Sequence, residues 1–301
     1  MALGVVTLAA LAATAIMVSQ STWARHSELA RDHAQAQLVI HAGLDWARAI
    51  LSDDRLVSNV DHPGEPWALQ LPPIPVDNGR LEGHLEDQQA RFNLNNLLTD
   101  GRVNVVQLAH FERLLTMLDL PEALAAALAD WLDANEEPQP QNGAEDDYYT
   151  ALNPPYLTAN RSLLDTAELA LVAGFDANVR ERLRRFVTAL PQQTPVNANT
   201  ASAEVLAAVI DGLNLDGARA LVMQREQSYF RNYEDFVTAL GSLTPAEVAT
   251  GVSARNEYIS VNSSYFIATA QVSYGSAQAR GEALLVRGNA GWPRILWRKS
   301  R

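Results

Sequence analysis

"MALGVVTLAALAATAIMVSQSTWAR", residues 1–25, holds 24 residues before its first charge at Arg25. As an α-helix with a rise of about 1.5 Å per residue, this stretch spans ~36 Å and is long enough to cross a bilayer. A cleavable signal peptide is the alternative, but the stretch lacks a positively charged start, and its apolar part exceeds the ~7–15 residues of such peptides. The sequence therefore predicts a transmembrane helix over residues 1–24.

The helical pattern continues beyond Arg25 to about Ser52. Apolar residues recur there at intervals of three and four, which is the spacing of one helix face. We therefore expect one long helix whose second part packs under a soluble domain. The residues of the predicted packing face are Ala34, Leu38, Ala42, Trp46 and Ala49.

Signals for β-strands lie at two places that are far apart in the chain. Residues 79–96, "GRLEGHLEDQQARFNLNN", show a short apolar and polar alternation, and residues 265–300 are rich in β-branched and aromatic residues. Residues 96–258 instead carry helix signals, such as "TAELALVAGF" at 166–175, which follows the N-cap signature Asp165 with Glu168. We predict an α+β fold in which a large all-helical domain is inserted between the strands of one antiparallel sheet.

Composition excludes several classes of function. The chain has 301 residues, a net charge of −12 and no cysteine, so it repels nucleic acid and anionic lipid at long range and has no disulfide or thiolate metal site. Its six histidines are scattered, and it contains no nucleophile-elbow or phosphate-loop motif. We therefore expect no enzyme activity.

An acidic stretch, "LADWLDANEEPQPQNGAEDDYY" at residues 128–149, holds seven carboxylates and no basic residue. Asp133, Asn135 and Glu137 have the spacing with which an EF-hand calcium loop begins. Pro138, however, stands where that loop needs glycine, and Ala144 stands where it needs its last acidic ligand. The stretch is therefore not an EF-hand.

A different calcium loop is one of three interpretations that stay open for this stretch. Gly143 would let the backbone turn so that Glu145 and Asp146 face Asp133 and Asn135, where a cation would relieve the repulsion between the carboxylates. A solvated acidic loop is the second interpretation. The third is a pair of catalytic carboxylates, about 5–9.5 Å apart, in a membrane-anchored hydrolase.

Residues 196–240 resemble the helix-hairpin-helix modules of DNA-uptake and DNA-repair proteins. Such modules bind phosphate through backbone N–H groups of a Gly-hydrophobic-Gly turn. Here the turn reads Gly212-Leu213-Asn214 and is flanked by Asp211 and Asp216, which would repel phosphate. We interpret this segment as a helical packing unit, with a membrane-anchored DNA-binding or DNA-uptake protein as the alternative function.

The whole chain resembles general secretion pathway protein K, the K-type minor pseudopilin of bacterial type II secretion. Several separate motifs in the same order carry this resemblance. They are the hydrophobic first helix, "DHPGEPWA" (61–68), "ARFNLNNL" (90–97), "DWLDANEE" with "GAEDDYY" (130–149), "NPPYLTAN" (153–160) and "VNANTA" (196–201).

The resemblance implies a pilin-like fold. Its domains are the transmembrane part of the first helix (1–24), a pilin-like α/β domain (25–95 and 259–301) and an inserted helical domain (96–258). It also implies a single-pass protein of the bacterial inner membrane, with its soluble domain in the periplasm. Family precursors carry a leader that the prepilin peptidase removes before N-terminal methylation, so Met1 is expected to be the first mature residue.

The resemblance further implies partners and a place in the fibre. Pilin-type subunits generally have a glutamate at mature position five, but K-type subunits typically lack it, and this chain has Val5. An unmatched acid in lipid costs several kcal/mol, so its absence suits a fibre end. The protein is expected to cap the tip of the pseudopilus and to start its assembly with I-type and J-type minor pseudopilins, before the other pseudopilins and the inner-membrane assembly platform join.

Family members bind structural calcium in the helical domain, so the resemblance implies calcium in the acidic stretch. We carry the ligand role to Asp133, Asn135, Glu145 and Asp146, which lie in the matching motif, and add Glu137 on its spacing alone. The family has aspartate more often at the position of Asn135.

Overall fold

The computed structural model describes residues 2–70, 72–140, 142–253, 257–288 and 291–300, without the side chains of residues 2, 3, 5, 6, 8, 9, 246, 247 and 253. Two compact units divide the chain. Unit 1 consists of Met1–Asp54, Pro66–Glu86 and Ile267–Arg301, and unit 2 consists of Arg55–Glu65 and Asp87–Phe266. The predicted combination of a long N-terminal helix with small sheets is confirmed.

Helix α1 (Ala2–Val57) is the long helix of unit 1 and has 56 residues. Its buried face differs from the predicted one: Ala34 and Ala42 are exposed, and Leu38 and Trp46 keep 63% and 43% of their surface exposed. The helix is apolar on more than one side, so spacing alone selects the wrong stripe. The buried apolar residues of α1 are Ala36, Ile40, Leu44 and Leu51.

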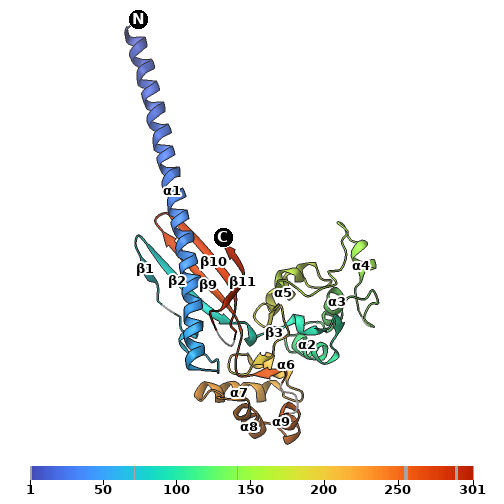
Figure 1. The fold of residues 1–301 in the computed structure, drawn as a ribbon. Coiled ribbons are helices and arrows are strands. Elements are labelled where there is room, and N and C mark those ends of the chain that lie inside the picture. Colours follow the sequence, from blue (N-terminus) through green and yellow to red (C-terminus); the bar gives the residue numbers. More distant parts are fainter. Residues whose placement is uncertain (1, 71, 141, 254–256, 289–290, 301) are drawn as a thin grey trace. The chain divides into compact units, whose positions relative to one another are not determined.

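A five-stranded sheet packs along the second part of α1 in unit 1 (Figure 1). Its order is β1 (Ile74–Val76), β2 (Gly79–Asp87), β9 (Tyr265–Tyr274), β10 (Ala277–Val286) and β11 (Arg294–Ser300), and the β1–β2 and β10–β11 pairs are antiparallel. Ile40 lies so close to Gly281 of β10 that a Cβ atom there would clash with it. Glycine therefore lets helix and sheet approach closely.

Unit 2 contains most of the helices, many of which begin at a short polar side chain that accepts a hydrogen bond from the first turn. Such N-caps stabilise a helix by about 1 kcal/mol, and here Asn104, Asp176, Ser202, Asn214 and Asn232 provide them. The helices are α2 (Val105–Met117), α3 (Ala123–Leu132), α4 (Asp146–Thr150), α5 (Ala177–Leu183), α6 (Ala203–Val209), α7 (Leu215–Gln227), α8 (Tyr233–Leu243) and α9 (Ala246–Ser253).

The prediction that the helical segment is all-helical is wrong. Short strand pairs lie within it or at its borders, because two-residue strands leave no periodicity that a sequence can show. "TAELALVAGF" contains the 3-10 helix η4 (Thr166–Leu171) instead of an α-helix, and Asp165 and Glu168 form the predicted capping box. The strand pairs are β3 (Phe92–Asn93) with β6 (Val187–Thr188), β4 (Leu98–Thr99) with β5 (Arg102–Val103), and β7 (Val196–Asn197) with β8 (Ile259–Ser260).

One continuous hydrophobic core holds unit 2 together. Phe92 stacks on Phe111 with ring centroids 5.7 Å apart, and Leu128, Leu206 and Phe236 are also fully buried in this core. Burial of each such side chain contributes about 1.5–3 kcal/mol.

None of the helices in the described part of the chain combines the length and the apolar character that crossing a membrane requires. The predicted transmembrane segment, residues 1–24, is therefore not confirmed. It includes residue 1 and six side chains that lie outside the described residues, and it stays a prediction.

Candidate functional site

The acidic loop, defined as the described residues 130–140 and 142–146, begins in the last turn of α3. Asp130 and Asp133 are one helical turn apart there, and both are fully buried. Carboxylates at a helix C-terminus face the negative end of the helix dipole. The fold therefore places two buried acids where the helix itself opposes their charge.

Asp130 fastens the far side of the loop to the helix. Its carboxylate accepts a hydrogen bond from the backbone N–H of Gln139, with distances of 3.0 and 3.2 Å to its two oxygens. Gly143 passes so close to Asp130 that a Cβ atom would clash with the carboxylate. Burial raises the pKa of Asp130 to about 6, although hydrogen bonds from Gln139 and Ala144 act against this shift.

Asp133 and Asn135 form a compact turn at the start of the loop. The side-chain and backbone N–H groups of Asn135 donate to the Asp133 carboxylate over 2.8 and 3.3 Å. The amide oxygen of Asn135 in turn accepts from the backbone N–H of Glu137 at 2.7 Å. Burial raises the pKa of Asp133, and the hydrogen bonds from Asn135 lower it.

Glu145 is a buried acid without hydrogen-bond partners for its carboxylate in the described part of the chain. It is 7% exposed, and both carboxylate oxygens are buried without a hydrogen-bond partner among the described residues. Burial, followed by the charges of Asp130, Asp133, Asp146 and Glu136, raises its pKa to about 7. A buried carboxylate that meets other acids and no donor is the environment that a bound cation would stabilise.

The remaining predicted ligands lie differently. Asp146 already accepts hydrogen bonds from the backbone N–H and the hydroxyl of Thr158 at 2.8 and 2.7 Å, which lower its pKa. Glu137 is exposed and belongs to the Asn135 turn through its backbone. Among the predicted ligands, the negative charges of Asp133 and Asp146 raise the pKa of Glu145. Glu137 and Asn135 are not among the residues that raise it.

Sequence reasoning missed Asp130 and Glu136. Asp130 precedes Asp133 by three residues on one helix, so helical spacing places both on the same face. That spacing could have identified Asp130. Glu136 acts on Glu145 only by its charge, which depends on how the loop folds back.

The calcium site stays a prediction, because among the described residues Asp130, Asp133 and Glu145 do not form a group whose carboxylate oxygens all lie within 4.8 Å of one another. Its buried acids Asp130, Asp133 and Glu145 offer carboxylate oxygens, the ligand type that calcium and magnesium prefer. These three residues include no nucleophile and no histidine base.

Aromatic rings fill the space between the acidic loop and the segment around Ala173. Tyr149 of α4 is fully buried, lies 5.1 Å from the ring of Trp131, and accepts a hydrogen bond from the backbone N–H of Ala173 at 3.1 Å. Burial raises the pKa of Tyr149 to about 12. The conformation of α4 is therefore linked to both the loop and this segment.

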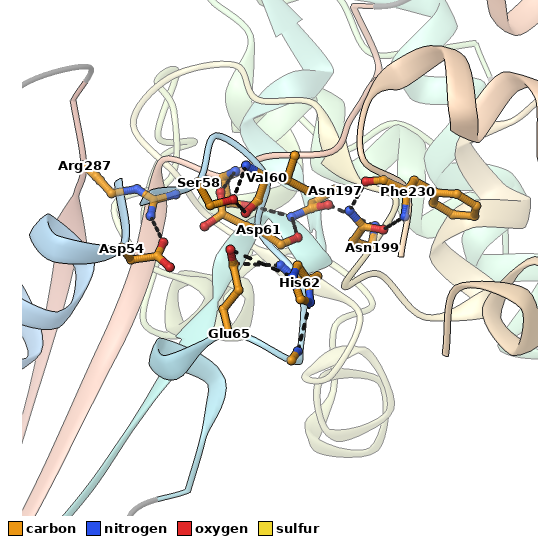
Figure 2. Close-up of polar contacts among 12 residues, drawn as sticks. Asp54, Ser58, Val60, Asp61, His62, Glu65, Asn197, Asn199, Phe230 and Arg287 are labelled. Atoms are coloured by element: carbon orange, nitrogen blue, oxygen red, sulfur yellow. Dashed lines mark hydrogen bonds and ion pairs between the residues drawn. The ribbon is translucent and has the colours of Figure 1, made fainter. Parts of the chain in front are cut away.

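The motif "VNANTA" has a structural role within unit 2. Asn197 donates to the backbone oxygen of Asp61 at 3.1 Å, and Asn199 exchanges two hydrogen bonds of 2.9 Å with the backbone of Phe230 (Figure 2). Asp61 also accepts from the backbone N–H of Ser263 at 2.7 Å. These two amides satisfy buried backbone groups of two distant segments, at Asp61 and Phe230, which explains why the motif contains asparagine.

Asp87 lies in the same buried network and is fully partnered. Its carboxylate accepts hydrogen bonds from Gln89 N (2.8 Å), Thr200 Oγ (2.5 Å), Ser263 Oγ (2.7 Å) and Asn197 Nδ2 (3.2 Å). Burial raises the pKa of Asp87 to about 6, the hydroxyl hydrogen bonds lower it, and the charge of Asp61 adds to the increase.

Within the helix-hairpin-helix-like segment, the turn Gly212-Leu213-Asn214 connects α6 and α7. Gly212 has φ +81°, a conformation that favours glycine, and Leu213 is buried. Asp211 pairs with Arg113 at 2.6 Å and Asp216 with Arg219 at 3.3 Å. Both acids remain beside the turn that would contact phosphate, so this geometry favours packing over DNA binding.

Comparisons with known proteins agree with each other. Two family models match the chain, over residues 90–192 and 196–262, and both are described as type II secretion system (T2SS), protein K. Type II secretion system protein K of Pseudomonas aeruginosa is 37% identical over 244 residues, covering 79% of this chain and 71% of that relative. Its counterpart in Klebsiella pneumoniae is 35% identical over 268 residues, covering 84% and 80%.

A solved structure has a similar fold. It is a chain of the crystal structure of the GspK-GspI-GspJ complex from the enterotoxigenic Escherichia coli type 2 secretion system. The TM-score is 0.79 at 26% sequence identity, and the match covers 92% of this chain and 99% of that chain. The similarity therefore includes both units.

Proposed function

The chain belongs to the type II secretion system protein K family, and on that premise we propose that it is a minor pseudopilin with a pilin-like fold and an inserted domain. The observation that carries the proposal is the similarity to the GspK-GspI-GspJ structure over 92% of this chain. The role is structural and involves no catalytic turnover. Its location is the inner membrane, with the uncharged segment before Arg25 as the anchor and the rest in the periplasm.

The partners in this proposal are the I-type and J-type minor pseudopilins of the same organism. The full chain, purified in detergent, is expected to co-elute with both partners in gel filtration at micromolar concentration. The I-type and J-type proteins without this chain are the control. Elution of this chain on its own in the presence of both partners would contradict the assignment.

The place in the fibre is the tip, where the protein would start assembly. A second unit of this size would obstruct lateral neighbours along the fibre, which supports a place at its end. Immunogold labelling of pseudopili is expected at one end of each fibre, and deletion of the gene is expected to reduce the number of fibres. Labelling along the whole length would exclude a cap.

A structural calcium ion in the acidic loop completes the proposal. The unpartnered oxygens of Glu145 next to Asp130 and Asp133 support it, and the predicted residues Asn135, Glu137 and Asp146 remain further candidates. Calcium at 1 mM is expected to raise Tm by several degrees relative to EDTA, because it binds only the folded loop. The rise should be absent in the Asp133→Ala/Glu145→Ala variant, and magnesium should give a smaller one.

No rise in Tm with calcium would mean that the loop is a solvated acidic segment. The assignment to the K family would stand in that case, since it depends on the similarity of the whole chain. The two proposals can therefore fail independently.

A further inference from the structure

A hollow beside the acidic loop has no role in the function described so far. We call it the Tyr148 hollow. It has a volume of about 330 Å³ and lies between α4 with its following turn and residues 170–176. Tyr148, Leu152 and Leu171 line it and keep 48%, 37% and 47% of their surface exposed. Three large, partly exposed apolar side chains in one hollow are typical of an anchor site for a partner side chain.

Hydrogen bonds that involve the hydroxyl groups of two tyrosines connect the walls of the hollow. Tyr149 accepts from the backbone N–H of Ala173, and the Tyr156 hydroxyl donates to the backbone oxygen of Leu171 at 3.0 Å. The rings of Tyr149 and Tyr156 lie 5.3 Å apart. One wall is thus the segment after the acidic loop, and the other is fixed to it through these hydroxyl groups.

The charge around the hollow selects the kind of partner. Asp176 lines it, and the exposed Asp147 follows Asp146 at the start of α4, next to Tyr148. None of the described residues that line the hollow is basic. An apolar side chain flanked by lysine or arginine therefore complements both the apolar walls and the acidic rim.

The shape of the hollow depends on the acidic loop. Glu145 directly precedes α4, and Asp146 binds Thr158 on the far side of the turn that carries Leu152 and Tyr156. Glu145 is buried, and neither of its carboxylate oxygens has a hydrogen-bond partner among the described residues, so no donor of the chain holds this side chain in place. Displacement of Glu145 would move α4 and remove Tyr148 and Leu152 from the hollow.

We propose that the Tyr148 hollow is a docking site for an apolar side chain flanked by basic residues in a partner protein, and that a cation in the acidic loop is required to form it. The second part rests on the proposed calcium site. Calcium would then act as a regulator of docking as well as a structural ion.

The test uses the full chain in detergent and the peptide acetyl-Lys-Lys-Phe-Lys-Lys-amide as the probe, titrated by calorimetry in 1 mM calcium and in EDTA. Binding is expected in calcium, with affinity lower by about fivefold or more in EDTA and for a peptide in which glutamate replaces each lysine. Far-UV circular dichroism and Tm of each variant establish that it is folded.

Matched variants separate the hollow from general attraction to an acidic protein. Leu152→Ser is expected to weaken binding by about fivefold, whereas Leu157→Ser, at a residue that is 60% exposed and does not line the hollow, should change it by less than about twofold. Asp147→Lys should weaken binding more than Asp53→Lys, which makes the same change in charge at another exposed acid.

Equal effects of Leu152→Ser and Leu157→Ser would overturn the docking site even if calcium raises Tm. Equal binding in calcium and EDTA would overturn the calcium dependence. If calcium also fails to raise Tm, the calcium site itself is wrong, so the melting experiment distinguishes failure of the calcium proposal from failure of the docking proposal.

Discussion

Asp87 and Glu145 are both buried carboxylates of unit 2, but they differ in the hydrogen-bond donors around them. Asp87 accepts hydrogen bonds from four donors, two of them hydroxyl groups. Glu145 meets no donor among the described residues and lies in the field of four other acids. The comparison teaches that the first site is complete within the chain, whereas the second requires a positive charge from outside.

Replacing Asp87 is expected to have the largest effect. Asp87→Ala removes the shared acceptor of four buried or partly buried donors, and each donor left unsatisfied costs about 1–3 kcal/mol. Because some donors will find water, we expect a loss of about 4 kcal/mol in the free energy of unfolding. Urea denaturation measures it, and the loss should be equal with calcium and with EDTA. If calcium changes the loss in the free energy of unfolding, the Asp87 site also depends on calcium and does not differ from the Glu145 site in this respect.

The pH dependence of Asp87 should be the next largest effect. Its pKa is about 6 in the folded protein against 3.8 for the free group, so the folded state binds more protons between these values. The contribution of Asp87 to the free energy of unfolding is therefore largest below pH ~4. It decreases as the pH rises through ~6, by up to about 3 kcal/mol. The difference in urea midpoint between the wild type and Asp87→Asn, measured across this pH range, isolates the effect and should decrease as the pH rises. An increase of this difference with pH would contradict the prediction.

Glu145→Gln should give a smaller effect whose sign depends on calcium. In EDTA the amide removes a repelled charge, and we expect the free energy of unfolding to rise by about 1–2 kcal/mol. In calcium the same substitution removes a ligand and should lower it by a similar amount. Glu137→Gln, at an exposed residue, is the control. If it shows the same reversal, Glu137 is also a ligand, as its spacing predicts.

Gly143→Ala should have the smallest effect and tests the geometry of the loop. A Cβ atom there would meet the Asp130 carboxylate and lie 2.5 Å from the nitrogen of Gln139. We expect a loss of about 1–2 kcal/mol and a higher calcium concentration at the midpoint of binding. Gly251→Ala, where nothing lies within 4 Å of the added atom, is the matched control. Equal effects of both substitutions would mean that the close approach at Gly143 is not required.

The sequence predicted the kinds of elements better than their contacts. Periodicity predicted α1, but the buried stripe contains Ile40 and Leu44 in place of Leu38 and Trp46. A helix with apolar residues on several sides has no single favoured face until a sheet packs against it. The strand pairs of unit 2 were not predicted, because pairing of Phe92 with Val187 depends on contacts across long stretches of the chain.

In the acidic loop, too, the sequence predicted the residues but not their contacts. Composition and spacing identified the stretch with Asp133 and Glu145, and the family motifs assigned the chain to its family. Sequence alone determined which residues were available, because residue type and order are enough to recognise helices, caps and motifs. The tertiary structure adds that Asp130 is buried beside Asp133, that one carboxylate oxygen of Asp146 accepts two hydrogen bonds from Thr158, and that Glu137 is exposed. Burial and hydrogen-bond partners come from packing between distant segments, and these set the charge environment of a carboxylate.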